Sequence, residues 1–356
     1  KPFLLLSLLL TFGLHADCAA WGTVGHRAIA EVAQRHLTPK AKAAIERYTG
    51  GTPLAEYAVF MDEVAADPRY KEPFRGWHAS IADAECNSPA EVREKYRKGR
   101  DGVTGAETLT AALKNYRELD DSVVLTYIKC IVHMVADFHC PAHVRYTDAH
   151  NEGKFDVTFF GKPKTLHSVW DSGVIARIHP GWSYERYADY LDNASKREIR
   201  RMTEGSYRQW FEDAARDVRP SIDWVAPGDT LGEEFMAKAA PLAEQQLRKA
   251  SYRLAAALNR IFGGGFSPAV PRASTAPSQS DVEANDPSGM TAIFRSSGPS
   301  CRTPPHTRPR SCRCATLRTR RAQRDSHRPS AECPAYRRAC RAHKFPLDNT
   351  PHRSGR

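Results

Sequence analysis

The stretch that decides the fold is DSVVLTYIKCIVHMVADFHCPAH, residues 121–143. Its apolar pattern predicts a helix buried in a core, yet His133 and Asp137 interrupt that pattern. Residues four positions apart lie on the same face of a helix, so both side chains point into the predicted core. Burying an imidazole and a carboxylate is costly unless the two groups pair or bind a metal. For this helix alone, a buried His–Asp pair and a metal site both remain open.

The same spacing recurs downstream in TLHSVWD, residues 165–171. There His167 and Asp171 are again four residues apart, and His143 lies between the two pairs. Imidazole nitrogens and carboxylate oxygens are ligands that zinc accepts. Two such pairs with an intervening histidine therefore favour a metal site over coincidental pairing.

Two segments upstream offer further candidate ligands. FMDEVAADPRY supplies Asp62, with Asp67 as a competing carboxylate, and GWHAS supplies His78. His36 and His150 have no partner at a comparable spacing. We therefore interpret these two histidines as loop or surface residues.

Most of the remaining sequence up to residue 263 has the periodicity of helices. Residues 26–48 place apolar side chains at helical spacing, and Thr38 followed by Pro39 indicates the start of a second helix. Residues 185–218 and 232–262 have the pattern of long amphipathic helices, whereas KFDVTFFG alternates like a strand and predicts a small hairpin. The sequence therefore predicts an all-α fold, a single helical domain over residues 21–263 with a small β-hairpin.

The first twenty residues have the features of a secretory signal peptide. A run rich in Leu and Phe ends in Cys18, Ala19 and Ala20, which places the cleavage site before Trp21. The run is too short to span a bilayer comfortably, and lipid attachment at Cys18 is the alternative interpretation. We expect an exported protein, periplasmic or extracellular, without stable membrane insertion.

The net charge of +11 is a property of the C-terminal tail. Residues 264–356 contain 17 Lys and Arg against 6 Asp and Glu, whereas residues 1–263 contain 35 of each. The tail is rich in Pro, Ser and Arg, which predicts disorder. It is either an Arg-rich arm that binds nucleic acid without catalysis or a linker or non-native extension, and its five scattered cysteines favour the second interpretation.

The segment WGTVGH, residues 21–26, follows the predicted cleavage site directly. A free α-amino group and the carbonyl oxygen of the same residue form a five-membered chelate to a metal. The turn between the two glycines could return His26 to the same ion. Trp21 would thus be a ligand only after cleavage.

In combination, WGTVGH, MDE, WH, HMVADFHCPAH and LHSVWD resemble the secreted zinc-dependent single-strand nucleases and 3'-nucleotidases of the S1/P1 type, with a phospholipase C/nuclease fold. The resemblance implies three zinc ions. It assigns Asp62, His78, His133 and Asp137 to one ion, His143, His167 and Asp171 to a second, and Trp21 and His26 to a third, with Asp137 bridging two of them. His139 matches a family position that is not a ligand, so the resemblance implies that it supports the ligands without binding an ion itself.

The resemblance also implies the reaction and its substrates. Single-stranded DNA or RNA and nucleotides would be cleaved to give 5'-phosphate and 3'-hydroxyl ends. Clustered zinc ions lower the pKa of water and neutralise the charge that develops on a phosphodiester. Asp62 would be the catalytic residue that orients this water or accepts its proton.

The chain departs from the family pattern at three positions. Ala65 replaces a basic residue, Ala79 replaces an aromatic residue that stacks on a base, and Thr165 replaces an Asn. The Gly-Gly-Asn run that is common in the family is also missing from residues 143–157. These departures leave base preference, rate and substrate identity open, while the proposed ligands are unchanged.

Two other functions remain open. The ligand set also resembles zinc-dependent phospholipase C, but the short gap from Trp21 to His26 and the carboxylate at Asp171 favour the nuclease. A periplasmic zinc-binding protein with weakened catalysis is the second alternative. Cys130 is predicted to be a buried free thiol, and Cys140 is predicted to be either free or an extra soft ligand.

Overall fold

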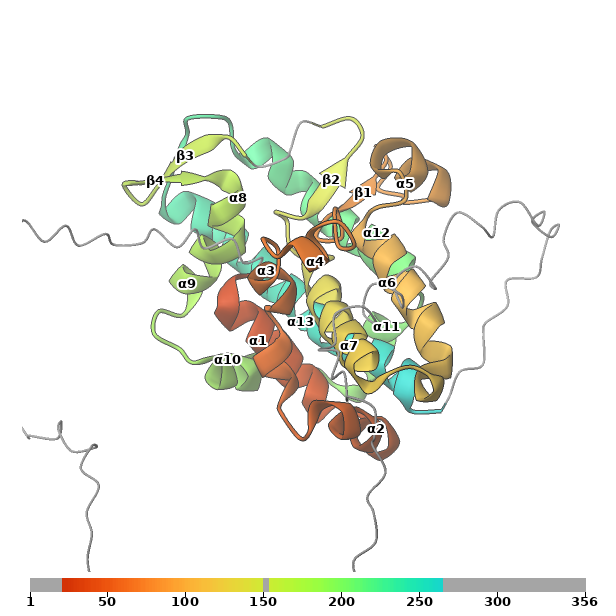
Figure 1. Cartoon of the computed structure of the whole chain (residues 1–356). Helices are drawn as coiled ribbons and strands as arrows, with labels where there is room; N and C mark the ends of the chain where they lie inside the picture. The colour runs from red at the N-terminus through yellow and green to blue at the C-terminus, as the bar shows by residue number, and fades with distance from the viewer. Residues whose placement is uncertain (1–20, 150–153, 265–356) are drawn as a thin grey trace, which may run out of the picture. The chain divides into compact units, whose positions relative to one another are not determined.

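A computed structural model of the chain describes residues 21–149 and 154–264 (Figure 1). The predicted signal peptide, the tail beyond Gly264 and His150 lie outside the described residues. The described part is mostly helical, so the predicted all-α fold is confirmed. No helix within it combines the length and hydropathy needed to cross a bilayer.

Three helices supply much of the core. α1 (Gly22–Arg35) and α7 (Asp121–Asp137) both pack against α13 (Glu233–Phe262), in front of which they lie in Figure 1. Their buried faces carry Ile29 and Leu254 among other apolar side chains. Because α1 and α7 also touch one another, the start of α1 and the end of α7 can contribute to one site.

The other helical segments are shorter. They are α2 (Pro39–Thr49), η1 (Leu54–Tyr57), α3 (Phe60–Glu63), α4 (Pro68–Lys71), α5 (Ala90–Arg97), α6 (Gly102–Ala112), η2 (Leu113–Glu118), α8 (Leu166–Ser168), the π-helical turn η3 (Val169–Gly173), α9 (Val174–Ile178), α10 (Tyr184–Leu191), α11 (Lys196–Thr203), α12 (Tyr207–Val218) and η4 (Arg219–Trp224).

The predicted boundary between the first two helices is confirmed. Thr38 caps α2, its hydroxyl accepting a hydrogen bond from the backbone N–H of Ala41 at 3.2 Å, and Pro39 occupies the first helical position. A proline costs nothing at this position because its missing N–H would have no helical partner.

Residues 185–218 form three helices, α10, α11 and α12, where the sequence predicts a long amphipathic pattern. Ser195 and Ser206 each start a helix through a capping box, with Glu198 and Gln209 as the reciprocal partners. Gly205 precedes the second box with a φ of 94°, a conformation that side chains rarely adopt. The apolar period continues across these breaks, which is why periodicity alone does not reveal them.

The predicted hairpin is confirmed as β3 (Asp156–Phe159) paired antiparallel with β4 (Lys162–Thr165), and the short β5 (Thr230–Leu231) pairs parallel with β3. A second, unpredicted sheet pairs β1 (Ser80–Ala82) parallel with β2 (Val144–Tyr146). Strands of three residues are too short to show a period. This pairing matters because it brings the segment before β1 next to the segment before β2.

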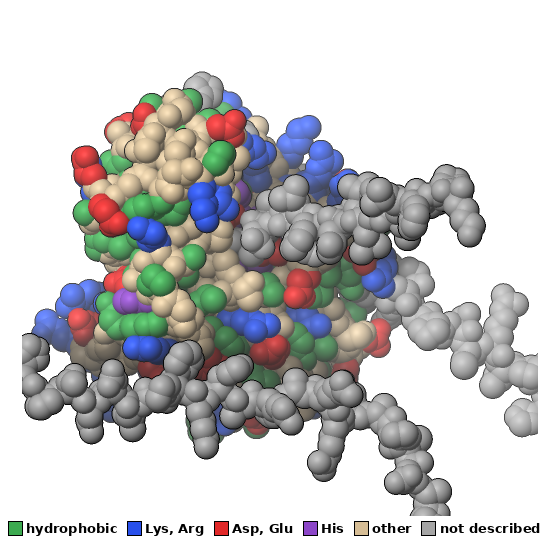
Figure 2. All heavy atoms as spheres, turned by 90° about the vertical axis from the view of Figure 1, so that its left-hand side faces the viewer, with side chains coloured by type: hydrophobic (Ala, Val, Ile, Leu, Met, Phe, Trp, Pro, Cys, Tyr) green, Lys and Arg blue, Asp and Glu red, His purple; other side chains and the backbone are tan. Residues whose placement is uncertain are grey.

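Charged side chains of both signs are interspersed over the face shown in Figure 2. This mixture agrees with the equal numbers of acidic and basic residues in residues 1–263.

Candidate metal centre

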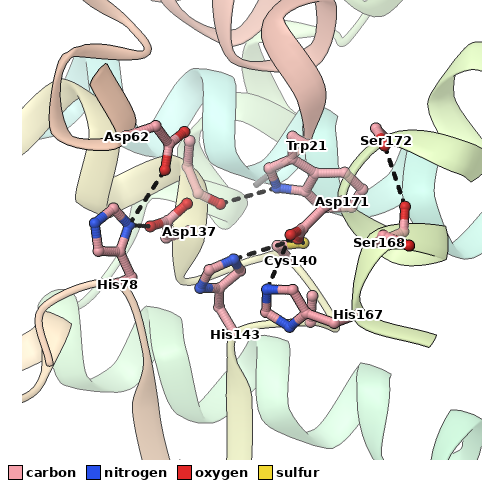
Figure 3. A network of polar contacts seen from close by, with 12 residues as sticks. Trp21, Asp62, His78, Asp137, Cys140, His143, His167, Ser168, Asp171 and Ser172 are labelled. Carbon is pink, nitrogen blue, oxygen red and sulfur yellow. Dashed lines mark hydrogen bonds and ion pairs between the residues drawn. The ribbon is translucent and has the colours of Figure 1, made fainter. Parts of the chain in front are cut away.

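The predicted ligands come from six parts of the fold, and eight of their side chains lie in two adjoining groups. Figure 3 shows Asp62, His78 and Asp137 of one group beside His143, His167 and Asp171 of the other. α1 and its first turn provide Trp21 and His26, α3 provides Asp62, the segment before β1 provides His78, α7 provides His133 and Asp137, the segment before β2 provides His143, and α8 with η3 provides His167 and Asp171.

Four donor atoms of the first group converge on one point. Asp137 Oδ2 lies 3.1 Å from His78 Nδ1 and 3.2 Å from His133 Nε2, and these two nitrogens are 3.2 Å apart. Asp62 Oδ1 lies 3.7 Å from His78 Nδ1 and 3.6 Å from His133 Nε2. Ligands at zinc–nitrogen and zinc–oxygen distances around a tetrahedral ion are about 3.3 Å apart, so these separations fit one zinc ion.

The ring of His133 is held with its Nε2 toward this point. Its Nδ1 donates a hydrogen bond to the carbonyl oxygen of Ala58 at 2.8 Å, which fixes the tautomer that leaves Nε2 available. The ring of His26 stacks on it at 4.4 Å with an angle of 7°. A metal-binding histidine generally donates its other ring N–H to such an acceptor, as His133 does to Ala58, and this bond fixes the orientation of the ring.

Several buried polar atoms of the centre have no hydrogen bond in the described part of the chain. His26 Nε2 lies 3.4 Å from Asp137 Oδ1, yet neither atom has hydrogen-bond geometry. Asp62 Oδ2 and His167 Nδ1 are also without a partner. A buried polar atom without a partner costs about 1–3 kcal/mol, and a cation bound among these atoms would remove that cost.

The second group surrounds Asp171. His143 Nε2 lies 3.3 Å from Asp171 Oδ1, and His167 Nε2 lies 2.9 Å from Asp171 Oδ2. The free thiol of Cys140 lies 3.5 Å from Asp171 Oδ1. The rings of His78 and His143 are 6.1 Å apart, so the two groups adjoin.

Burial and charge act in opposite directions on the ionisable groups. Burial alone would raise the pKa of Asp137, but His133 and His143 outweigh it and hold this pKa well below its usual range. Burial alone would lower the pKa of His133, but Asp137 and Asp62 raise it to about 9. The negative charge of the two carboxylates therefore outweighs burial at this point, an environment that favours a cation.

The first turn of α1 explains the glycines of WGTVGH. Trp21 and Gly22 have φ values of 55° and 57°, and a Cβ on Gly25 would lie 2.9 Å from the Cβ of Trp21. The Trp21 ring is fully buried, and its Nε1 donates to the carbonyl oxygen of Ala136 at 3.0 Å. The expected turn is thus the first turn of a helix, and it places His26 beside Asp137.

Three residues considered from the sequence lie apart from the two groups. Asp67 caps α4 and contacts Arg69 at 2.6 Å, so it does not compete with Asp62. His36 Nε2 lies 2.7 Å from Asp192 Oδ1. His139 accepts a hydrogen bond from Arg253 at 2.9 Å and donates one to the carbonyl oxygen of Val135 at 2.9 Å.

Among the positions that depart from the family pattern, Thr165 caps α8 by accepting from the N–H of Ser168 at 3.1 Å. Two arginines that follow Ala65 in the sequence are engaged elsewhere: Arg69 contacts Asp67, and Arg75 contacts Glu72.

Sequence reasoning missed Arg145, whose positive charge acts to lower the pKa of His143. Its Nη1 donates to the carbonyl oxygen of Ala142, the residue before His143, at 2.6 Å. The sequence carries no periodic signal for Arg145, because His143 lies in the turn before β2 and not on the strand.

The sequence model of one protein family, described as S1/P1 Nuclease, matches residues 21–263. Nuclease S1 of Aspergillus oryzae is 27% identical over 291 residues, which cover 73% of this chain and 98% of that protein. Endonuclease 2 of Arabidopsis thaliana is 25% identical, covering 68% of this chain and 91% of that protein. Nuclease P1 of Penicillium citrinum is 24% identical, covering 68% of this chain and 98% of that protein.

Proposed function

The chain belongs to the S1/P1 nuclease family, and on that premise we propose that it is a zinc-dependent phosphodiesterase. It would hydrolyse single-stranded nucleic acids and 3'-nucleotides to 5'-phosphate and 3'-hydroxyl ends. The observation that supports this most is the convergence of Asp62, His78, His133 and Asp137 at tetrahedral separations. The relatives of this chain are named as nucleases and endonucleases, and these names agree with the proposed class of substrate.

We propose three zinc ions, held by two groups of side chains and by the amino terminus that cleavage would create at Trp21. They would be held by Asp62, His78, His133 and Asp137, by His143, His167 and Asp171, and by Trp21, His26 and Asp137. The fit is supported by the buried histidine and carboxylate atoms that lack hydrogen bonds.

The chemistry of the reaction divides between the ions and this chain's residues. Bound zinc ions supply Lewis acidity, which lowers the pKa of water and offsets phosphodiester charge. Asp62 directs Oδ1 to His78 and His133, and its Oδ2 is buried without a hydrogen-bond partner in the described part of the chain, so this carboxylate can orient a water molecule or accept its proton. His78 and His167, with 28% and 21% of their side chains exposed, mark the side from which substrate reaches the centre.

Arg145 is the residue that we propose to contact the substrate's phosphate. It lies two residues after His143, its positive charge acts on His143, and its Nη1 donates to the carbonyl oxygen of Ala142 at 2.6 Å. A planar guanidinium matches the oxygens of a phosphate, which it can contact in a bidentate manner. This placement would compensate for Ala65.

Export fits the same proposal. The amino group of Trp21 can bind an ion only when the preceding residues have been removed, and the carbonyl oxygen of Trp21 keeps a second lone pair beside its 3.2 Å bond from the N–H of Gly25. We therefore propose a periplasmic or extracellular enzyme that is active after cleavage before Trp21.

The test compares four substrates with and without a chelator. Processed protein is incubated with single-stranded DNA, single-stranded RNA, 3'-AMP and phosphatidylcholine, alongside the variants His133→Ala and His36→Ala. His36 is a matched control because it is a paired histidine outside the centre. We expect hydrolysis of the nucleic acids and 3'-AMP by the unaltered protein and His36→Ala, and its loss in His133→Ala or with the chelator.

Each other outcome selects a different function. Hydrolysis of phosphatidylcholine alone would identify a phospholipase C. Zinc binding without turnover of any substrate would identify a zinc-binding protein. Hydrolysis of DNA that persists in His133→Ala would refute the assigned centre.

A further inference from the structure

Cys140 places a thiol against the second group of candidate ligands. The residue is fully buried, forms no disulfide, and directs its Sγ toward Asp171 Oδ1 at 3.5 Å (Figure 3). Its Sγ, one ring nitrogen of His143 and one oxygen of Asp171 all lie within 4.8 Å of one another. Cys140 is therefore part of the same cluster of donor atoms as the predicted ligands.

The separations in this cluster match those expected around one ion. A sulfur at about 2.3 Å and an oxygen at about 2.0 Å from a tetrahedral zinc are about 3.5 Å apart, and a nitrogen and an oxygen are about 3.3 Å apart. The observed distances are 3.5 Å from Cys140 Sγ and 3.3 Å from His143 Nε2 to Asp171 Oδ1.

A second observation shows that a hydrogen bond from the Cys140 thiol to the Asp171 carboxylate does not by itself explain this cluster. Both ring nitrogens of His143 are buried without a hydrogen-bond partner in the described part of the chain. A thiol is a weak donor and leaves these nitrogens unsatisfied. An ion placed among the three groups would satisfy Nε2 of His143, the carboxylate and the sulfur together.

We propose that Cys140 binds, as a thiolate, the ion held by His143, His167 and Asp171. The proposal rests on the proposed function, which places an ion in this group. When the ion binds, the S–H bond breaks, its proton passes to solvent, and a metal–sulfur bond forms without any change of oxidation state. The donor set then consists of two nitrogens, one oxygen and one sulfur, all from the protein.

This donor set changes what the ion can do. Four protein ligands resemble a closed site more than an open catalytic one, and the thiolate donates more charge to the ion than water does. The ion would therefore serve chiefly to organise the site and to offset the charge of a nearby phosphate, with no open position for a water molecule. A thiolate also favours softer dications, so cadmium should compete more strongly here than at a site of nitrogen and oxygen donors.

The test uses cobalt as a spectroscopic substitute for zinc in the full processed chain. Metal-free protein is titrated with Co²⁺, and the thiolate-to-cobalt absorption in the near ultraviolet is recorded with the visible bands of tetrahedral cobalt. Cys140→Ala and Cys140→Ser are compared with Cys130→Ala, a buried free thiol in α7. The cysteines of the tail are present in every variant, so the difference spectrum isolates Cys140.

We expect the near-ultraviolet band to decrease in both Cys140 variants and to remain in Cys130→Ala. Affinity for one of the bound ions should fall by about 10-fold or more in Cys140→Ala. Identical near-ultraviolet spectra for the unaltered protein and Cys140→Ala, with the visible bands present, would overturn the sulfur ligand and leave the proposed function standing. No visible band that is sensitive to His143→Ala would instead overturn the metal centre itself.

Discussion

At the scale of single residues, the centre depends on buried groups that cannot satisfy one another. Asp137 contacts His26, His78 and His133, and only 1% of its side chain is exposed. One carboxylate cannot give each of these rings a good hydrogen bond. The proposed shared cation would resolve that conflict, and it would account for the polar side chains in an otherwise apolar helix.

Asp137→Asn tests this account with little change in volume. The amide keeps the size of the carboxylate but loses its charge and presents a donor to the cluster. We expect hydrolysis of single-stranded DNA to fall by more than about 100-fold, with loss of bound zinc. Asp192→Asn, which alters a carboxylate paired with His36 outside the centre, should keep its activity. Full activity and zinc content in Asp137→Asn would remove Asp137 from the site.

The proposed amino ligand gives a second residue-scale prediction. A protein with one additional glycine before Trp21 has an amide where the mature protein has an amine. We expect it to lose about one zinc ion and most of its activity, as measured by elemental analysis and hydrolysis of 3'-AMP. Equal zinc content and activity in the two proteins would refute the chelate.

At the scale of elements, one buried arginine joins the end of α7 to two other helices. Arg253 of α13 donates to His139 just after α7, to Asp213 of α12 at 2.6 Å, and to the carbonyl oxygen of Met202 in α11 at 2.9 Å. These bonds hold the turn that separates Asp137 from the following ligands. The arrangement supports the interpretation of His139 as a supporting residue.

Arg253→Met tests this link. The variant keeps an apolar stem but leaves His139 and Asp213 without their partner, so the free energy of unfolding should fall by about 3 kcal/mol. Urea denaturation measures this change. Arg177→Met is the control, because Arg177 makes an exposed ion pair with Glu233 that should contribute about 0–1 kcal/mol. Equal stability of the two variants would show that the buried arginine is dispensable.

The pKa of Asp213 predicts a pH dependence for the same link. Burial alone would raise this pKa, but hydrogen bonds and charges from Lys249 and Arg253 lower it to about 2. A lowered folded-state pKa contributes stability that is present above the unfolded value of 3.8 and is lost as the pH falls toward 2. After allowance for partial exposure, this contribution is about 1 kcal/mol.

Asp213→Asn should therefore be less stable than the unaltered protein at pH 6, and the difference should shrink between pH 4 and pH 2. Denaturation of both proteins across this range measures it, and loss of metal at low pH is common to both. A difference that stays constant with pH would contradict the assigned cause.

Sequence periodicity predicts the long elements and misses the short ones. α1, α7 and the β3–β4 hairpin have enough residues for a pattern to be visible. The three-residue strands β1 and β2 have none, although their pairing is what places His78 near His143.

The candidate site was predictable to a similar extent. The two His-x-x-x-Asp pairs identify its centre, because i and i+4 on a helix converge whatever the tertiary fold. Arg145 and the contact of Cys140 with Asp171 depend on how separate elements pack, so local spacing alone could not establish them.

At the scale of the whole molecule, the centre lies where α1, α7, and the segments before β1 and β2 meet, so the proposed metal binding would be linked to folding. An unfolded chain separates Trp21 from Asp171 and would bind ions weakly. An ion that binds only the folded state stabilises it by about 4 kcal/mol at a thousand times its dissociation constant. The proposed ions would thus offset the cost of burying histidines and carboxylates.

An anomalous difference map at the zinc absorption edge, from crystals of the processed protein, would locate bound zinc directly. We expect three peaks, one among Asp62, His78, His133 and Asp137, one between Trp21 and His26 beside Asp137, and one among His143, His167 and Asp171. A map with no peak at these residues, in crystals grown with zinc, would contradict the proposed centre.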